Sequence, residues 1–302
     1  IVPILSKLKA KLKYIASSKG LSSTTLAKKY GITNSTTDAN VIFNDTEVDA
    51  VIITTRHNQH EGQVIKGIQS GKHVFVEKPL AITYEGLDRI LDEYKKYNKS
   101  LTVGFNRRFS PFAQEAKKLI GNDGHVINVI ATMNAGAIPS DHWVQDMEVG
   151  GGRIIGEACH YIDLITFLTG SLVDEVIVNA QGTHPQSDTD NMSILLKYKN
   201  GSQGVINYFS DGHKAYAKER IDVFDQGKNI VIDNFRKSEY FGYKSNGMKK
   251  TQDKGHFNQF RKWNEMITNG GEAIIPIEEI MNTSRASIAC IESLTSRQWV
   301  KV

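Results

Sequence analysis

The sequence predicts an α/β part with a doubly wound parallel sheet, followed by an α+β part with a largely antiparallel, open sheet. Three observations support this fold class. In the first third of the 302 residues, short apolar runs alternate with helical patterns, as in parallel sheets that helices cover on both faces. After residue 126 the strand-like runs follow one another directly. Between two of these runs, Asn200-Gly201 is a strong hairpin signal.

The first part is predicted to span residues 1–105. Apolar residues recur every three or four positions in its helical segments, whereas its strands are short and rich in β-branched residues. Ser22 or Ser23 would cap the first complete helix, and Gly31 would end it. We expect right-handed crossovers, strands at 12–18, 48–55, 73–79 and 101–106, and helices at 22–31, 60–72 and 83–99.

The second part is predicted to span residues 106–302. Gly227 lies between two alternating runs and marks a second hairpin. We expect the C-terminal helix to pack back on the first part. The predicted strands occupy 126–136, 174–184, 191–210 and 220–235, the last two as hairpins, and the predicted helices occupy 159–170 and 278–296.

Composition and charge exclude several classes of protein. The net charge is +4 and the lysines are scattered, so we expect no nucleic-acid partner. Two cysteines make no disulfide framework, no apolar run approaches the ~20 residues of a membrane span, and the start lacks signal-peptide architecture. We therefore expect a cytoplasmic protein with no membrane partner. His57 and His60 have no cluster of further ligands near them in the sequence, so we expect no metal site.

Polar residues follow three successive predicted strands. In open α/β sheets, ligands bind at the carboxyl ends of the strands, so these residues would point into one crevice. Lys78 is followed by Pro79, which biases the lysine to an extended conformation and permits a cis bond. A lysine held there could donate to a substrate hydroxyl or stabilise an alkoxide. The residues at these strand ends are Thr54, Thr55, Glu77, Lys78 and Asn106.

The chain resembles the glucose–fructose oxidoreductase/inositol dehydrogenase (Gfo/Idh/MocA) family along nearly its whole length. The resemblance rests on "GKHVFVEKP" after "HNQH", on "GFNRRFSP" at the expected distance, and on "GGGRIIGEACHYIDL" and "KGHFNQF" further on. It implies an NAD(P)-dependent oxidoreductase that acts on a sugar, a sugar nucleotide or a cyclitol. It also implies that Lys78 and His160 are the catalytic lysine and histidine, and that the dinucleotide is lined by Thr54, Thr55, Asn58, His60, Glu77, Lys78 and Asn106.

Residues near His160 form a second group. Glu157 and Asp163 lie three residues before and after it, so both would neighbour it on a helix, and either could orient it as a base. We therefore place Glu157 among the catalytic residues and Asp163 at the substrate. Trp143 is a candidate sugar-stacking platform or a loop anchor. Arg107 could bind an anionic substrate group or pair with an acid.

The sequence departs from the family pattern in two places. Where members often have Asp four residues before the histidine, this chain has Gly156, next to Glu157. No G-x-G-x-x-G motif is present, and the opening residues resemble the end of a first helix followed by a second strand. We therefore expect a Rossmann-like sheet that lacks its first strand and glycine turn, unless another segment takes their place.

Three further expectations follow. Ser17, Ser18 and Lys19 stand where an acid often holds the ribose 2′-hydroxyl, which favours NADP over NAD, although an ordinary solvated turn fits as well. The open antiparallel sheet and the resemblance favour a homodimer or homotetramer. The alternatives to a dehydrogenase are an NAD-dependent glycoside hydrolase that oxidises its substrate transiently, and a catalytically silent binding protein on the same scaffold.

Overall fold

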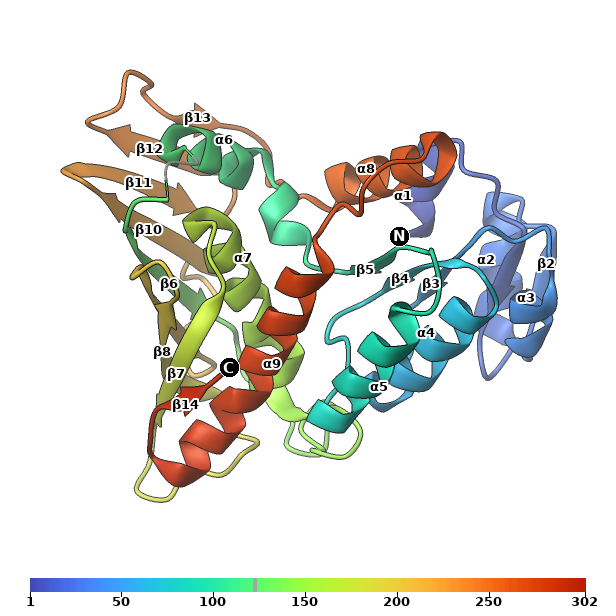
Figure 1. The fold of residues 1–302 in the computed structure, drawn as a ribbon, viewed down its shortest axis with the longest axis horizontal. Helices are drawn as coiled ribbons and strands as arrows, with labels where there is room; N and C mark the ends of the chain where they lie inside the picture. Colours follow the sequence, from blue (N-terminus) through green and yellow to red (C-terminus); the bar gives the residue numbers. More distant parts are fainter. Residues whose placement is uncertain (122–123) are drawn as a thin grey trace.

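The structure is a computed structural model that describes residues 1–121 and 124–302. Two parts lie side by side, and the long C-terminal helix runs between them (Figure 1). The first part comprises α1 (Val2–Lys7), β1 (Tyr14–Ala16), α2 (Leu21–Tyr30), β2 (Asn34–Thr36), α3 (Asn40–Asn44), β3 (Ala50–Ile53), η1 (His57–Gln59), α4 (His60–Gln69), β4 (His73–Val76), α5 (Tyr84–Tyr94) and β5 (Leu101–Val103).

The remaining elements build the second part and return to the first. They are η2 (Asn106–Phe109), α6 (Pro111–Ile120), β6 (Asn128–Asn134), the π-helix η3 (Ile154–Ala158), α7 (Cys159–Thr169), β7 (Val173–Ala180), β8 (Asn191–Tyr198), β9 (Gln203–Phe209), β10 (Glu219–Asp225), β11 (Lys228–Asp233), β12 (Lys237–Phe241), β13 (Met248–Lys249), α8 (His256–Asn269), α9 (Ile277–Ser296) and β14 (Val300–Lys301).

The parallel strands form two separate sheets rather than one. β1 pairs with β2, and β3, β4 and β5 pair in that order. Within the described ranges no strand joins the two sheets. The fold class is confirmed, but β2 and α3 were not expected, because their residues carry little apolar periodicity.

Local signals explain where several helices begin and end. The Thr83 hydroxyl caps α5 by accepting a hydrogen bond from the Gly86 amide, at 3.1 Å. α2 ends at Gly31 in the left-handed conformation, as expected. The expected serine cap of α2 is wrong: the helix begins at Leu21 after Gly20, and the Ser23 hydroxyl donates back to the Gly20 carbonyl at 2.7 Å.

The second part is a nine-stranded sheet in the order β13-β12-β11-β10-β6-β9-β8-β7-β14. Both expected hairpins are present: Gly201 (φ 89°) turns β8 into β9, and Gln226-Gly227 (φ 46° and 80°) turns β10 into β11. The sheet is antiparallel except for β6 and β9, which pair in parallel because the chain leaves β6 through a long crossover.

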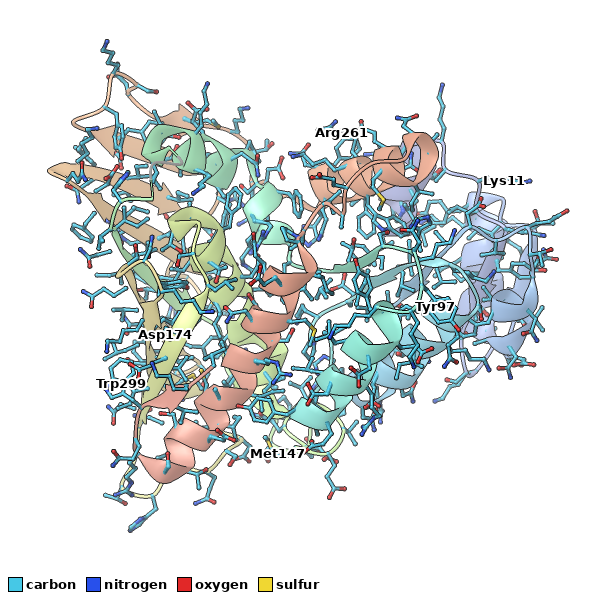
Figure 2. All side chains as sticks on the ribbon, viewed as in Figure 1. Lys11, Tyr97, Met147, Asp174, Arg261 and Trp299 are labelled. Carbon is cyan, nitrogen blue, oxygen red and sulfur yellow. The ribbon has the colours of Figure 1, made fainter. Side chains whose placement is uncertain are left out.

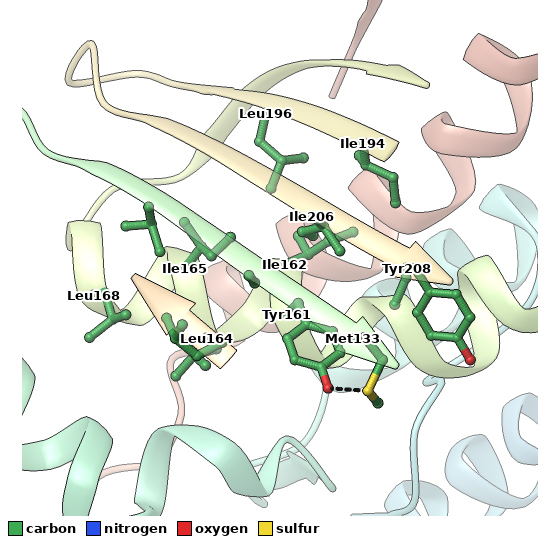
Figure 3. Close-up of a cluster of buried hydrophobic side chains, with 14 of the residues drawn as sticks. Met133, Tyr161, Ile162, Leu164, Ile165, Leu168, Ile194, Leu196, Ile206 and Tyr208 are labelled. Atoms are coloured by element: carbon green, nitrogen blue, oxygen red, sulfur yellow. Dashed lines mark hydrogen bonds between the residues drawn. The ribbon is translucent and has the colours of Figure 1, made fainter. Parts of the chain in front are cut away.

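Helices α6, α7 and α9 cover one face of this sheet (Figure 1). Figure 3 shows the centre of this core, where α7 packs against the strands, and the Tyr161 hydroxyl donates to the Met133 sulfur at 3.0 Å. The apolar residues of this core are fully buried and include Ile162, Ile165, Leu168, Ile194, Leu196 and Ile206. On the opposite face, Leu195, Phe209 and Phe224 are exposed, and no helix of the described residues covers them (Figure 1).

The last two helices also pack on the first part. Phe75 of β4 contacts Phe260 and Trp263 of α8, with ring centroids 4.6 and 5.5 Å apart. α9 contacts α5 and β5 as well as β7. The C-terminal helices therefore tie the two parts together, whereas the boundary at 105/106 stays a prediction. No helix in the described ranges is long and apolar enough to cross a bilayer.

Candidate active site

The carboxyl ends of β3, β4 and β5 meet at one edge of their sheet, as the parallel register requires. Thr54 and Thr55 follow β3 and are exposed, and Glu77 and Lys78 follow β4 and are partly buried. Asn58 is exposed on η1, where its backbone N–H donates to the Val149 carbonyl at 3.0 Å. The structure thus brings the residues of this edge together in space.

Lys78 is held in one orientation. The Lys78–Pro79 peptide bond is cis, and the lysine Nζ donates to the carbonyl of Gly156 at 2.5 Å. Gly156 lies in the π-helix η3 of the second part, so this hydrogen bond joins the two parts. A lysine fixed in this way presents a positive charge at a defined place.

The Glu77 carboxylate packs directly against the backbone of Gly104, the residue that follows β5. A Cβ on Gly104 would lie 2.7 Å from Oε2 of Glu77, so glycine is what allows this approach. Burial raises the pKa of Glu77, although the Lys78 charge opposes the shift.

His60 braces the loop behind Lys78. Its Nδ1 lies 2.7 Å from the Pro79 carbonyl and its Nε2 lies 3.1 Å from the Thr55 carbonyl. Burial lowers the pKa of His60, and a neutral imidazole donates to one of these carbonyls at a time. The structure therefore gives His60 a supporting position beneath the strand ends rather than one that lines the dinucleotide.

His57 fills the space beside Gly156 and was missed as a site residue. Its Nδ1 donates to the Gly150 carbonyl at 2.6 Å, and its ring lies edge-on to Trp143 with centroids 4.8 Å apart. A Cβ on Gly156 would lie 3.1 Å from Cε1 of His57, which explains why this chain has glycine there. Burial lowers the pKa of His57 to about 4, so the ring is neutral at pH 7. The Arg56 guanidinium carbon lies over the Trp143 ring, 5.7 Å from its centroid, so two neighbouring side chains hold this tryptophan in its loop.

His160 is buried at the start of α7, with 6 % of its surface exposed. Its Nδ1 has no hydrogen-bond partner among the described residues. Burial lowers the pKa of His160 well below 6.5, and the charges of Arg107, Lys78 and Lys254 act in the same direction. The imidazole is therefore neutral and able to accept a proton.

The expected contact between Glu157 and His160 is wrong. Glu157 belongs to η3, whose wider π turn changes the i, i+3 relation that a continuous α-helix would give. Its carboxylate accepts from Arg153 at 2.9 Å and from the Tyr208 hydroxyl at 2.6 Å. Although burial acts to raise it, the pKa of Glu157 is lowered by this hydroxyl and by nearby cations.

Asp163 and Arg107 are also engaged elsewhere. Asp163 accepts two hydrogen bonds from Arg108, at 2.6 and 3.0 Å, so neither orienting His160 nor contacting a substrate is its role in this structure. Arg107 pairs with Glu219 through two bonds of 3.1 Å, which decides between its two expected roles in favour of the acid. Both pairs are buried, and both join residues that are distant in sequence.

Two further groups of expected cofactor residues differ in their surroundings. The Asn106 amide is buried and donates to the Lys254 carbonyl at 2.7 Å, so it is held against the loop before α8. Ser17, Ser18 and Lys19 follow β1 and remain accessible, with Ser17 accepting from the Ser22 hydroxyl at 3.1 Å.

Other residues beside the site were not predicted, among them Arg153, Tyr208, Lys218, Glu219 and Lys254. Most of their partners lie far away in the sequence, although Arg153 also pairs with Glu157 four residues on. Lys254 lies in the "KGH" segment that was noted for the resemblance alone. In the described part of the chain, no group of three or more His, Cys, Asp or Glu side chains is placed to hold a metal. Two surface depressions of about 390 and 510 Å³ lie beside β7 and β8, and neither is lined by Lys78 or His160.

Comparison with known proteins agrees with a Rossmann-like part followed by a second part that contains the nine-stranded sheet. Residues 3–105 match the family described as "Oxidoreductase family, NAD-binding Rossmann fold", and residues 113–227 match the "GFO/IDH/MocA C-terminal domain". Myo-inositol 2-dehydrogenase from Thermotoga maritima is 29 % identical over 222 residues, 70 % of this chain and 65 % of the relative. The NAD⁺-dependent scyllo-inositol 2-dehydrogenase of Bacillus subtilis is 29 % identical over 60 % of this chain and 54 % of the relative.

These alignments thus cover less than two thirds of the length of either curated relative. Among solved structures, levoglucosan dehydrogenase in complex with NADH and levoglucosan has a TM-score of 0.83 at 21 % identity, covering 96 % of this chain and 90 % of that one. A probable dehydrogenase from Thermotoga maritima has a TM-score of 0.82 at 23 % identity, covering 99 % and 95 %. The chain therefore belongs to the Gfo/Idh/MocA oxidoreductase family, with the family's Rossmann domain and C-terminal domain in that order.

Proposed function

We propose that the protein is an NAD(P)-dependent oxidoreductase that transfers hydride between a hydroxyl-bearing carbon of a sugar, sugar nucleotide or cyclitol and nicotinamide. One observation carries the proposal: the Lys78 Nζ donates to the carbonyl of Gly156, four residues before the buried His160, so the strand end and the start of α7 meet at one place. The pair combines a fixed positive charge with a free proton acceptor, as oxidation of an alcohol requires.

The residues present fit a nicotinamide cofactor. The strand ends offer the exposed hydroxyls of Thr54 and Thr55, and Glu77 is held beside Lys78 by its contact with Gly104. When bound, the cofactor supplies a two-electron acceptor for the hydride. The accessible residues Ser17, Ser18 and Lys19 follow β1 without an acid, which supports a 2′-phosphate and hence NADP over NAD.

The protein's own groups handle the proton. In the oxidation direction the hydroxyl proton moves to the His160 imidazole, and the Lys78 ammonium stabilises the negative charge that develops on the oxygen. The two C–H bonding electrons leave with the hydride, so the carbinol carbon becomes a carbonyl carbon. Because His160 is neutral, it is ready to accept the proton at pH 7.

The test is a fluorescence titration of the folded chain with NADH and with NADPH, followed by turnover of a panel of sugars and cyclitols. We expect micromolar binding of at least one cofactor and stoichiometric formation of reduced cofactor with one substrate. Release of a glycone without net reduction would instead indicate the glycoside hydrolase. Binding of neither cofactor to folded protein would contradict the proposal and favour a silent binding protein.

We also propose that the open sheet face forms a homodimer or homotetramer. Cross-strand neighbours place four apolar side chains in one row on this face: Ile177, Leu195, Val205 and Ile130. Leu195 is 43 % exposed, and Trp299, near Asp174 at the β7 edge, is 44 % exposed (Figure 2). Light scattering should give a multiple of 33.7 kDa, and Leu195→Lys should shift it toward the monomer. A monomeric wild type would contradict this assembly.

A further inference from the structure

The surroundings of His160 contain more cations than carboxylates. We call these side chains the cationic cluster, and they are Lys78, Arg107, Arg153, Glu157, His160, Lys218, Glu219 and Lys254. They come from the end of β4, η2, η3, α7, the start of β10 and the segment before α8. Five of them are basic residues and two are acidic.

One carboxylate, that of Glu219, forms ion pairs with two cations. Arg107 donates to both of its oxygens at 3.1 Å, and the Lys254 ammonium lies 2.5 Å from Oε1. Glu219 is buried, whereas the Lys254 side chain keeps 19 % of its surface exposed. This group therefore carries one net positive charge, and its accessible member is a lysine.

A second carboxylate, Glu157, serves two more cations. Arg153 contacts it at 2.9 Å and the Lys218 ammonium lies 3.8 Å from it. The Tyr208 hydroxyl donates to the same carboxylate, so its acceptor capacity is already in use. Lys218 is 45 % exposed and loosely paired, so this group also has a net positive charge and an accessible lysine.

Lys78 adds a third excess charge, because its hydrogen-bond acceptor is a backbone carbonyl rather than a carboxylate. The carboxylate of Glu77, the preceding residue, packs against Gly104. His160 has only 6 % of its surface exposed, and its Nδ1 has no hydrogen-bond partner among residues 1–121 and 124–302. Cations without a matching carboxylate and a buried nitrogen without a hydrogen bond cost free energy unless a ligand pairs with them.

We infer that the substrate carries an anionic group, a carboxylate or a phosphate, that binds Lys218 and Lys254 while its reacting hydroxyl meets Lys78 and His160. This inference rests on the proposed function and names the class of substrate. A dinucleotide lies along the carboxyl ends of the parallel strands, whereas Lys218 and Lys254 belong to the other part of the chain. The excess charge therefore faces the substrate rather than the cofactor's phosphates.

The test compares glucose with glucuronate and with glucose 6-phosphate, by calorimetric titration of the protein bound to NADH or to NADPH, whichever it binds. We expect one of the two anions to bind at least about ten-fold more tightly than glucose, as one charge-assisted hydrogen bond would give. Preference for glucuronate would identify a carboxylate, and preference for glucose 6-phosphate a phosphate. Equal or tighter binding of glucose, or no binding of either anion, would overturn the inference.

Two variants locate the effect. Lys218→Gln and Lys254→Gln should each remove most of the preference for the anion, whereas Lys118→Gln, an exposed lysine on α6, should leave it unchanged. Anion preference that survives both substitutions would overturn the inference. If the variants weaken cofactor binding instead, the charges contact the cofactor and the inference is also wrong. Failure of the wild type to bind either NADH or NADPH would contradict the proposed function itself.

Discussion

Two charged clusters lie along the junction between the two parts, and they differ in how completely they are paired. In the first, Arg108 donates to Asp163 at 2.6 and 3.0 Å and to Glu279 at 2.7 Å, so one guanidinium is matched by two carboxylates. We call these three residues the paired cluster. Within the part of the chain that the structure describes, the cationic cluster has an excess of positive charge and an imidazole nitrogen without a hydrogen-bond partner. We infer that the paired cluster holds η2, α7 and α9 against one another, and we propose that the cationic cluster binds a ligand.

Near neighbours in the sequence belong to different clusters. Arg107 and Arg108 are adjacent on η2, yet the first pairs with Glu219 and the second with Asp163. His160 and Asp163 are less than one turn apart on α7, yet His160 belongs to the cationic cluster and Asp163 to the paired cluster. Substitutions at these neighbouring positions can therefore test whether the two clusters have different functions.

The largest effect is expected from Lys78→Met. Because it removes the charge that stabilises the substrate oxygen, kcat/KM should fall by about 10³-fold. The free energy of unfolding should change by about 1 kcal/mol or less, because one hydrogen bond to Gly156 is lost. Steady-state kinetics and urea unfolding measure both, with Lys95→Met, exposed at the end of α5, as the control. A Lys78→Met variant with wild-type turnover would refute the catalytic assignment.

Arg108→Met should mainly affect stability. It leaves the buried Asp163 carboxylate without its partner, so the free energy of unfolding should fall by about 3–5 kcal/mol. The folded variant should keep kcat within a few-fold of wild type at low temperature. Arg220→Met, which breaks the exposed pair with Asp222, should cost less than about 1 kcal/mol. Equal losses in the two variants would mean that the paired cluster does not stabilise the packing of η2, α7 and α9.

Stability should decrease as the pH falls from 7 to 5. The pKa of His57 is lowered to about 4, so its ring stays neutral in the folded chain from pH 7 to pH 5, while the unfolded chain takes up a proton below pH 6.5. His57 therefore contributes up to about 2 kcal/mol of loss over this range. Burial also lowers the pKa values of His60 and His160, so both act in the same direction. Urea unfolding at several pH values measures the slope.

His57→Gln should flatten that slope, whereas His184→Gln, in an exposed loop, should not. A slope that is the same in wild type and His57→Gln would show that His57 is not kept neutral by burial.

The smallest effect is expected from Gly156→Ala. The added Cβ would lie 3.1 Å from Cε1 of His57, so the ring and the Gly156 carbonyl that holds Lys78 must move by a few tenths of an ångström. We expect kcat to fall a few-fold, with a stability change of about 1 kcal/mol or less. Gly62→Ala in α4 is the matched control, because its Cβ meets open space. Unchanged kcat in Gly156→Ala would show that Lys78 does not depend on this contact.

The sequence predicts the backbone of the site better than its side-chain pairing. Strand ends, the proline after Lys78 and the Gly201 and Gly227 turns depend on local patterns, and the structure confirms them. The roles of Arg107 and Asp163 depend on partners 112 and 55 residues away, which no local pattern indicates. Glu157 was misplaced because the π turn of η3 breaks the helical spacing assumed for it. His57 was missed because its place beside Gly156 arises from contacts with a distant loop.

The most direct test compares His160→Gln with Asp163→Asn, less than one turn apart on α7, by measuring kcat/KM and the free energy of unfolding for each. The comparison of the two clusters predicts that His160→Gln loses about 10²-fold or more in kcat/KM with little change in stability. It predicts that Asp163→Asn loses several kcal/mol of stability while its folded fraction keeps its turnover. Full activity in His160→Gln, or loss of turnover in folded Asp163→Asn, would contradict it.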